Sequence, residues 1–198
     1  MTWLMQPAAW LYGQVVAARN RRFDAGMRVT DVGVPVISIG NITVGGTGKT
    51  PMVQWAVQQL QAAGGTPAIA MRGYLAEQGA ASDEVMEHQA AFPDVPVLVG
   101  PNRVTQIRRH FEASVNTDVI VLDDGFQHRF VDRALDVVLI DARHDLRQGH
   151  LLPRGRMREP GHSLRRADAV VVTHVDHAVW DASAWIEEHH QSAPIASC

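Results

Sequence analysis

A glycine-rich stretch carries the residues best suited to phosphate chemistry. It reads Val44-Gly45-Gly46-Thr47-Gly48-Lys49-Thr50. An apolar run, 36–40, precedes it, and a pattern typical of a helix, 51–63, follows it. Strand, glycine-rich loop, Gly-Lys-Thr and helix is the order of phosphate-binding P-loops. There the glycines let successive backbone N–H groups surround an anion, and the helix N-terminus adds partial positive charge. We therefore interpret 44–50 as a binding site for nucleotide phosphates.

The last two residues of this loop have separate roles in the predicted site. The ammonium of Lys49 reaches the β- and γ-phosphates, and the hydroxyl of Thr50 can ligate Mg²⁺. Lys49 is the only lysine of the chain, which has 18 Lys and Arg residues in total. A compact ammonium is therefore favoured at this position. The loop departs from the usual pattern at Thr43, where a glycine normally stands. Gly45 and Gly46 can supply the flexible turn instead.

A second signal is an apolar strand that ends in two carboxylates. The run 118–122 reads as a buried strand and leads into Asp123, Asp124 and a glycine. Downstream of a P-loop, acidic residues at a strand end hold Mg²⁺ opposite the Ser or Thr ligand. Gln127 and His128 follow in the same loop, at the carboxyl edge where open α/β sheets bind ligands. The sequence thus predicts a magnesium and nucleotide site at this strand end.

The elements that must position these residues alternate between strands and helices. Apolar runs read as strands at 67–71, 95–99, 136–141 and 168–173. This order predicts an α/β fold, a P-loop NTPase-like, mostly parallel sheet with flanking helices. The helix after the loop is expected to bury Trp55 together with Met52, Ala56 and Leu60. A further helix begins at Pro101 and carries Arg103 just after a strand end.

The first 28 residues predict an amphipathic helix that precedes this domain. Seven residues fall at three- and four-residue steps, so that Trp and Leu share one face: Trp3, Pro7, Trp10, Leu11, Gln14, Val15 and Ala18. The segment ends in an arginine-rich cluster, 19–22. Aromatic residues on one face with arginines at one end suit a helix that lies on an anionic membrane surface. The alternative is that the same apolar stripe packs on the domain, as such stripes usually do.

The composition narrows the class of protein. A chain of 198 residues with 46% hydrophobic content can bury a substantial core. A net charge of −3 argues against general nucleic-acid binding. The single cysteine, Cys198, allows no disulfide framework, which fits a reducing cytosol. No apolar run approaches the roughly 20 residues that span a bilayer. No basic leader precedes the first apolar residues, so we expect no signal peptide.

The exact residues of six motifs are more specific than a generic P-loop pattern. In chain order they are Gly40–Pro51, Arg72-Gly73-Tyr74, Asp83-Glu84, Val99-Gly100-x-x-Arg103, Leu122–His128 and Leu152-Pro153-x-Gly155-x-x-Arg158-Glu159-Pro160. Together they closely resemble the tetraacyldisaccharide 4'-kinase family, the lipid A 4'-kinases of bacteria with an outer membrane. The resemblance spans nearly the whole chain, and Thr43 is the family's own variant of the loop.

The resemblance implies a reaction and a place for it. The family transfers the γ-phosphate of ATP, with Mg²⁺, to the 4'-hydroxyl of an acylated glucosamine disaccharide 1-phosphate, a precursor of lipid A. It does so at the cytoplasmic face of the inner membrane, as a peripheral protein. The implied partners are this lipid substrate and the inner-membrane surface. We expect a monomer that binds no nucleic acid.

The resemblance also implies roles for particular residues. Asp83 would be the base that accepts the proton of the sugar hydroxyl, and it would form the catalytic set with Lys49 and Asp124. The expected magnesium ligands are Thr50, Asp123, Asp124 and Glu84. The expected nucleotide contacts are the loop 44–50 together with Gln127 and His128. The candidates for holding the disaccharide or a phosphate are Arg72, Tyr74, Arg103 and Arg158.

The resemblance implies a domain organisation as well. We expect an N-terminal membrane-interface helix, 1–28, followed by a P-loop kinase domain, 29–198. Family members are longer and carry a second α/β lobe, which supplies a His that pairs with the catalytic Asp. Here that lobe would be absent or only begun, with 193–198 as the start of a further strand. Two alternatives stay open: a nucleotide-binding module without phosphoryl transfer, and another P-loop ATPase or ligase that does not need Asp83.

Overall fold

The computed structural model describes residues 5–26, 28–73, 83–113, 116–190 and 194–198. The chain forms two compact units, each built from strands and helices. Unit 1 comprises Met1–Arg28, Asn41–Gly48 and Asp136–Cys198, and unit 2 comprises Val29–Gly40 and Lys49–Leu135. The chain passes from unit 1 to unit 2 between Gly48 and Lys49, inside the predicted phosphate loop.

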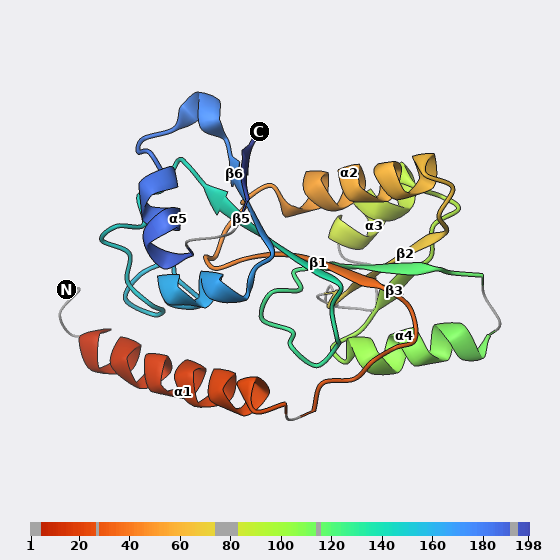
Figure 1. Cartoon of the computed structure of the whole chain (residues 1–198), viewed down its shortest axis with the longest axis horizontal. Helices are drawn as coiled ribbons and strands as arrows, with labels where there is room; N and C mark the ends of the chain where they lie inside the picture. Colours follow the sequence, from red (N-terminus) through yellow and green to blue (C-terminus); the bar gives the residue numbers. More distant parts are fainter. Residues whose placement is uncertain (1–4, 27, 74–82, 114–115, 191–193) are drawn as a thin grey trace. The chain divides into compact units, whose positions relative to one another are not determined.

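Unit 2 is built on four parallel strands in the order β3-β2-β4-β1 (Figure 1). The strands are β1 (Val36–Asn41), β2 (Pro67–Met71), β3 (Val97–Val99) and β4 (Val119–Asp123). In the register of β1 and β4, Ile39 lies opposite Asp123. Every residue of β2 and β4 is buried. Continuous apolar runs of this kind are typical of parallel strands covered on both faces.

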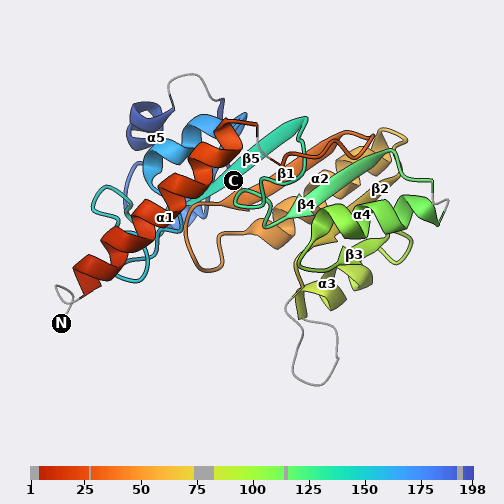
Figure 2. The same ribbon diagram turned by 90° about the horizontal axis from the view of Figure 1, so that it is seen from below.

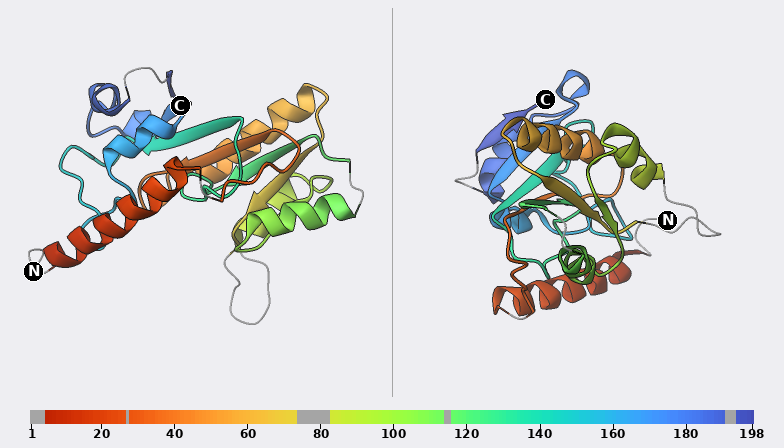
Figure 3. Two further views of the ribbon diagram at one scale, coloured as in Figure 1. Left: turned by 60° about the horizontal axis from the view of Figure 1, so that its bottom comes forward. Right: turned by 90° about the vertical axis from the view of Figure 1, so that its right-hand side faces the viewer.

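Helices cover both faces of these strands. They are α2 (Lys49–Ala62), α3 (Asp83–Ala91) and α4 (Arg103–Glu112). Figures 1 and 3 show α2 and α3 on one face and α4 on the other. On the α4 side, Ile107 packs in a cluster with strand residues, among them Ala70, Ile120 and Leu122. Asn102 caps the N-terminus of α4, and its side chain accepts a hydrogen bond from the backbone N–H of Thr105 at 3.2 Å. Arg103 is therefore fixed at the first position of a capped helix.

Unit 1 contains the other three strands, which also pair in parallel in the order β5-β6-β7. They are β5 (Leu135–Asp141, in this unit from Asp136), β6 (Ala169–Thr173) and β7 (Ile195–Ser197). The helices of unit 1 are α1 (Gln6–Asp24), α5 (Ser183–His189) and the 3₁₀ helices η2 (Gly161–Arg166) and η3 (Val175–His177). The expected terminal strand is thus present as β7, and the predicted mostly parallel α/β fold is confirmed.

Helix α1 is one uninterrupted helix (Figure 2). Two hydrogen bonds join it to a distant part of unit 1: the Tyr12 hydroxyl donates to the Arg158 carbonyl at 2.9 Å, and Asn20 Nδ2 donates to Glu159 at 2.7 Å. Three residues of the predicted stripe are exposed, with exposed fractions of 66% for Trp10, 59% for Leu11 and 60% for Val15, whereas Ala18 is half-buried and Trp3 lies outside the described residues. Trp10, Leu11 and Val15 therefore do not pack on unit 1, contrary to the alternative. None of the described helices is long and apolar enough to cross a membrane.

One core prediction for α2 is also wrong. Trp55 is 57% exposed, and the buried residues of the helix are Val53, Ala56 and Val57. Each residue turns a helix by about 100°. A buried stripe centred on these three positions therefore places Trp55 on the opposite side.

The packing of β1 predicts that Gly40→Ala destabilises the protein. A Cβ at Gly40 would lie 2.6 Å from both the Cβ and the backbone nitrogen of the fully buried Phe126. Because backbone cannot move aside cheaply, we expect the free energy of unfolding to fall by about 1–3 kcal/mol. Urea denaturation measures it. Gly46→Ala is the matched control, since a Cβ there would meet nothing within 4 Å. Equal stability of the two variants would contradict the expected clash.

Candidate functional site

The phosphate loop in unit 1 has the backbone conformation that the glycines were expected to permit. Gly45 and Gly48 have φ angles of +113° and +83°, in the region that favours glycine. Within the described part of the chain, the backbone N–H groups of Gly45, Gly46, Thr47 and Gly48 donate no hydrogen bond. Successive N–H groups left open in this way are what an anion nest requires.

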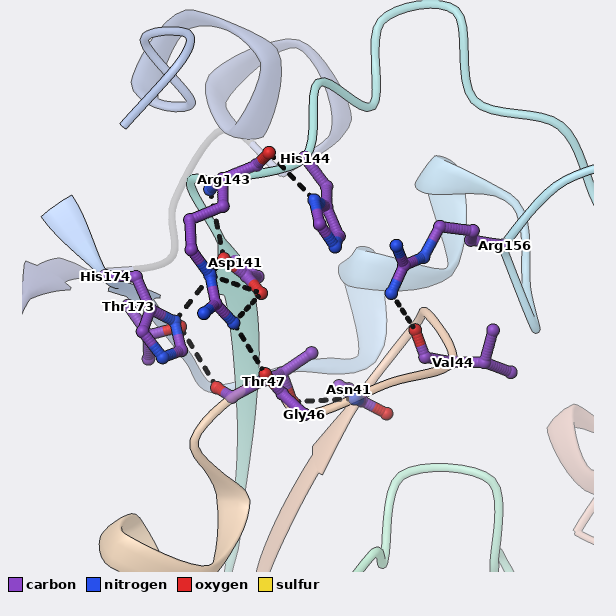
Figure 4. A network of polar contacts seen from close by, with 10 residues as sticks. All are labelled: Asn41, Val44, Gly46, Thr47, Asp141, Arg143, His144, Arg156, Thr173 and His174. Atoms are coloured by element: carbon purple, nitrogen blue, oxygen red, sulfur yellow. Dashed lines mark hydrogen bonds and ion pairs between the residues drawn. The ribbon is translucent and has the colours of Figure 1, made fainter. Parts of the chain in front are cut away.

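The carbonyl groups of the same loop, by contrast, are bonded to side chains (Figure 4). Arg156 Nη2 donates to the Val44 carbonyl at 3.3 Å, Arg143 Nη2 to that of Gly46 at 2.9 Å, and the Thr173 hydroxyl to that of Thr47 at 3.0 Å. Asn41, at the end of β1, donates from Nδ2 to the Thr47 hydroxyl at 2.7 Å. The loop is therefore fixed by side chains that donate hydrogen bonds to its carbonyl and hydroxyl oxygens.

The unusual Thr43 has a simple structural explanation. It is buried and forms an antiparallel bridge with Met157. On either side of it, the Arg158 N–H donates to the Ile42 carbonyl at 2.7 Å, and the Val44 N–H donates to the Arg156 carbonyl at 2.8 Å. Because position 43 pairs in a ladder and the chain turns only from Gly45 on, no glycine is needed there. The backbone of Arg158, a predicted substrate contact, is fixed beside the start of the loop.

In unit 2, Lys49 lies near the second of the two predicted acidic residues. Its Nζ is 3.8 Å from Asp124 Oδ1, and the side chains of Lys49 and Asp124 are 15% and 30% exposed. Asp124 has a φ of +51°. A left-handed conformation is uncommon for residues other than glycine but tolerated by Asp, and it often marks a functional position. The structure thus brings together Lys49 and Asp124, two of the three residues of the expected catalytic set.

Asp123 has a different environment from its neighbour. Its carboxylate is buried, and Oδ2 lies 3.1 Å from Nε2 of the fully buried His88 in α3. Arg103 Nη2 donates to the Asp123 carbonyl at 3.4 Å, and its Nη1 lies 3.3 Å from Nδ1 of His128. Since a guanidinium can only donate, Nδ1 of His128 is the acceptor. Arg103, a predicted substrate contact, is itself buried and joins the strand end to His128.

The loop that follows β4 is fixed by a residue that sequence reasoning did not identify. Arg133 Nη2 donates to the carbonyls of Gly125 and His128, at 2.8 and 2.7 Å. One guanidinium thus closes the turn that contains Gln127, which is half-buried.

The remaining predicted residues lie at the end of β2, in α2 and in α3, or outside the described chain. Asp83 and Glu84 are exposed in the first turn of α3, and among the described residues neither side chain forms a hydrogen bond or ion pair. Arg72 is exposed just after β2. Thr50 is half-buried in the first turn of α2. Tyr74 lies outside the described residues.

The oxygen donors of unit 2 fit Mg²⁺ in their chemistry. Thr50 offers a hydroxyl and Asp124 a partly exposed carboxylate, whereas one oxygen of Asp123 is bonded to His88. In the described part of the chain, no group of three or more His, Cys, Asp or Glu is arranged to hold a metal. Mg²⁺ often uses only one or two carboxylates and takes its other ligands from water and phosphates. Thr50 and Asp124 therefore remain the best-placed candidates.

His88, Arg133 and Arg143 are the supporting residues that sequence reasoning missed. His88 had a weak signal, because it follows Val85 by three positions and so shares the buried face of α3. For Arg133 and Arg143 the only signal in the sequence was that each lies a few residues from a predicted strand. A local sequence pattern does not distinguish such an arginine from one exposed to solvent.

The pairing of His88 with Asp123 predicts a loss of stability on substitution. In His88→Leu the buried carboxylate loses its hydrogen-bond partner, so we expect the free energy of unfolding to fall by about 1–3 kcal/mol. Urea denaturation is the measurement. His177→Leu, which changes an exposed histidine, is the control and should stay within about 0.5 kcal/mol of the parent. A His88→Leu variant as stable as this control would show that the pair contributes nothing.

Comparisons with known proteins agree with the motifs. Residues 1–197 match the family model described as tetraacyldisaccharide-1-P 4'-kinase. The tetraacyldisaccharide 4'-kinase of Chlorobium luteolum is 40% identical over 192 residues, which cover 87% of this chain and 54% of that protein. The enzyme of that name from Anaeromyxobacter sp. (strain Fw109-5) is 41% identical over 188 residues, 86% of this chain and 50% of that protein.

A solved structure agrees with the same assignment. LpxK from Aquifex aeolicus, determined in complex with ATP, is similar with a TM-score of 0.80 and 29% identity, over 99% of this chain and 64% of that one. The present chain spans about half the length of the curated relatives that it matches. The family model covers nearly every residue of it, and the chain therefore belongs to the tetraacyldisaccharide 4'-kinase family.

Proposed function

We propose that this chain provides the ATP-binding and catalytic core of a kinase that phosphorylates the 4'-hydroxyl of an acylated glucosamine disaccharide 1-phosphate, a lipid A precursor. The observation that carries the proposal is the approach of Lys49 to Asp124 directly after a loop whose N–H groups are open. Family membership supplies the substrate class, and the Aquifex LpxK, which was solved with ATP, supports the choice of nucleotide.

The proposed nucleotide site uses the loop and the start of α2. The N–H groups of 45–48 and the Lys49 ammonium surround the β- and γ-phosphates, where they offset negative charge. Thr50 and Asp124 hold Mg²⁺, with Asp123 and Glu84 as further candidates. ATP supplies the phosphoryl group, and Mg²⁺ supplies charge neutralisation on its oxygens. Gln127 and His128 are proposed as further contacts of the nucleotide.

The proposed proton acceptor is Asp83. A sugar hydroxyl is a poor nucleophile, so a base must take its proton as the new P–O bond forms and the bond to ADP breaks. The exposed position of Asp83 in the first turn of α3 leaves its carboxylate accessible to a substrate. Arg72, Tyr74, Arg103 and Arg158 are proposed to hold the disaccharide or its phosphate, and the buried Arg103 would do so partly through His128.

The proposed place of action is the cytoplasmic face of the inner membrane, with a monomer attached as a peripheral protein through 1–28. The exposed Trp10, Leu11 and Val15 give α1 an apolar surface. Arg21 and Arg22 lie in its last turn, where cations suit both the helix dipole and anionic headgroups.

Phosphoryl transfer provides the direct test. The chain is incubated with γ-labelled ATP, Mg²⁺ and the acylated disaccharide 1-phosphate in detergent micelles, beside Lys49→Ala and Asp83→Ala. We expect turnover by the parent. Lys49→Ala should lose ATP binding and activity. Asp83→Ala should bind ATP normally and lose activity by about 10²–10⁴-fold, because only proton transfer is affected. Glu87→Ala, exposed one turn further along α3, is the matched control.

Each other outcome has a definite meaning. ATP binding through Lys49 without any turnover would make the chain a nucleotide-binding module that needs further residues of its longer relatives. Turnover that is insensitive to Asp83→Ala would refute the assignment of the base. ATP hydrolysis without transfer to the disaccharide would favour a different P-loop ATPase.

Membrane attachment is tested with lipid vesicles. Trp10→Ser should lower the binding of the chain to vesicles that contain anionic lipid by roughly tenfold, since a buried indole contributes on the order of 1.5–3 kcal/mol. Co-sedimentation measures the bound fraction. Trp55→Ser is the matched control, because Trp55 is similarly exposed, on α2. If both variants bind as the parent does, α1 is not the contact surface.

A further inference from the structure

The Gly46 carbonyl of the phosphate loop is bonded to an ion pair, formed by the buried Asp141 and the partly exposed Arg143, that the proposed mechanism does not use. We propose that Asp141 and Arg143 form a brace that fixes the Gly46 carbonyl and thereby keeps the loop in its phosphate-binding shape. Arg143 acts as a positioning residue, and Asp141 acts through Arg143. The inference rests on the proposed nucleotide-binding function of the loop and names residues that set its affinity.

The contacts of Arg143 are specific in geometry (Figure 4). Nε lies 3.0 and 3.3 Å from the two carboxylate oxygens of Asp141, and Nη2 donates to Oδ2 at 2.8 Å. The same Nη2 donates to the Gly46 carbonyl at 2.9 Å. The Arg143 backbone N–H also bonds to Asp141 Oδ1 at 3.0 Å. The guanidinium therefore has one orientation, set by Asp141 at the end of β5.

The consequence for the loop follows from the planar trans peptide, in which C=O and N–H point in opposite directions. The Gly46 carbonyl belongs to the same peptide unit as the Thr47 N–H. Holding that carbonyl on Arg143 directs the Thr47 N–H away from Arg143, toward the open side of the loop. The Thr173 hydroxyl does the same for the Gly48 N–H by holding the Thr47 carbonyl. When the N–H donors are already fixed, less free energy is spent on ordering them as an anion binds.

Asp141 is suited to this task by its surroundings. Its side chain is only 4% exposed. Burial would raise the pKa of this carboxyl, but the hydrogen bonds and charge of Arg143 outweigh burial and hold the pKa below its usual value. His174 Nδ1 lies 3.4 Å from Oδ1 of the same carboxylate and does not hydrogen-bond to it. The carboxylate thus remains an ionised anchor for Arg143.

The chain contains a natural control for this arrangement. Arg147 repeats the local geometry four residues later: its backbone N–H and Nε bond to Asp145, and Nη2 donates to the same carboxylate at 2.6 Å. Instead of the phosphate loop, Arg147 faces the ring of Trp180, at 5.9 Å from the ring centroid. The two Asp-x-Arg pairs therefore form the same ion pair and differ in the group that the arginine contacts, which is the Gly46 carbonyl for Arg143 and the Trp180 ring for Arg147.

The test compares Arg143→Gln with Arg147→Gln in the 198-residue chain. Equilibrium dialysis with labelled ATP and Mg²⁺ gives the Kd, and ¹⁵N relaxation without nucleotide gives the order parameters of the amides of 45–48. We expect Arg143→Gln to raise the Kd roughly tenfold, as the loss of a hydrogen bond from a charged group does, and to lower the order parameters in 45–48 but not in β5 or β6. Arg147→Gln should change neither quantity. Asp141→Asn should resemble Arg143→Gln, and the double variant should be no worse than either.

The outcomes separate the brace from the proposed function. Equal Kd values and equal order parameters in Arg143→Gln and Arg147→Gln would overturn the brace while ATP binding by the parent upholds the function. Lower order parameters throughout β5 and β6 would show a general structural role and also overturn it. If the parent binds no ATP, the proposed function fails, and with it the link to affinity; the order parameters of 45–48 then decide whether the brace holds the loop.

Discussion

The phosphate loop satisfies one demanding constraint: its backbone acceptors must be bonded while its donors stay open. A loop that paired both within itself would have nothing to offer an anion. Here the carbonyls of Val44, Gly46 and Thr47 are taken by Arg156, Arg143 and Thr173, and the N–H groups of 45–48 are left without a partner within the described chain. Most of the polar contacts of unit 1 near the loop serve this division.

Unit 2 meets a related constraint at the end of β4. Two successive acidic residues must diverge, because two ionised carboxylates close together repel each other. Asp123 turns inward to His88, and Asp124, in a left-handed conformation, approaches Lys49 instead. Arg103 and Arg133 then fix the strand end and the following turn through backbone carbonyls. The predicted site residues at this strand end are thus held in place by His88, Arg103 and Arg133.

Family membership and local geometry provide independent support for the proposed kinase function. The family gives the substrate class, which no contact in this chain identifies. The geometry gives a reason for the particular residues, such as a threonine at position 43 that pairs in a ladder with Met157. The chain spans about half of its curated relatives. The proposed base, Asp83, is exposed in the first turn of α3, whereas the proposed phosphate-binding groups are already supported by contacts within their own units.

The sequence by itself determined the parts that depend on local order. The P-loop motif, the acidic strand end and the alternation of strands with helices follow from residue types at short spacing, and they led to the correct fold and family. The tertiary structure alone decided which side chains support them. His88 pairs with Asp123 over 35 residues of sequence, and Arg143 bonds to the Gly46 carbonyl over 97. Trp55 was misplaced for a related reason, since the direction of a helix face depends on what packs against it. Contacts at such separations are set by the packing of strands and helices, which no local pattern records.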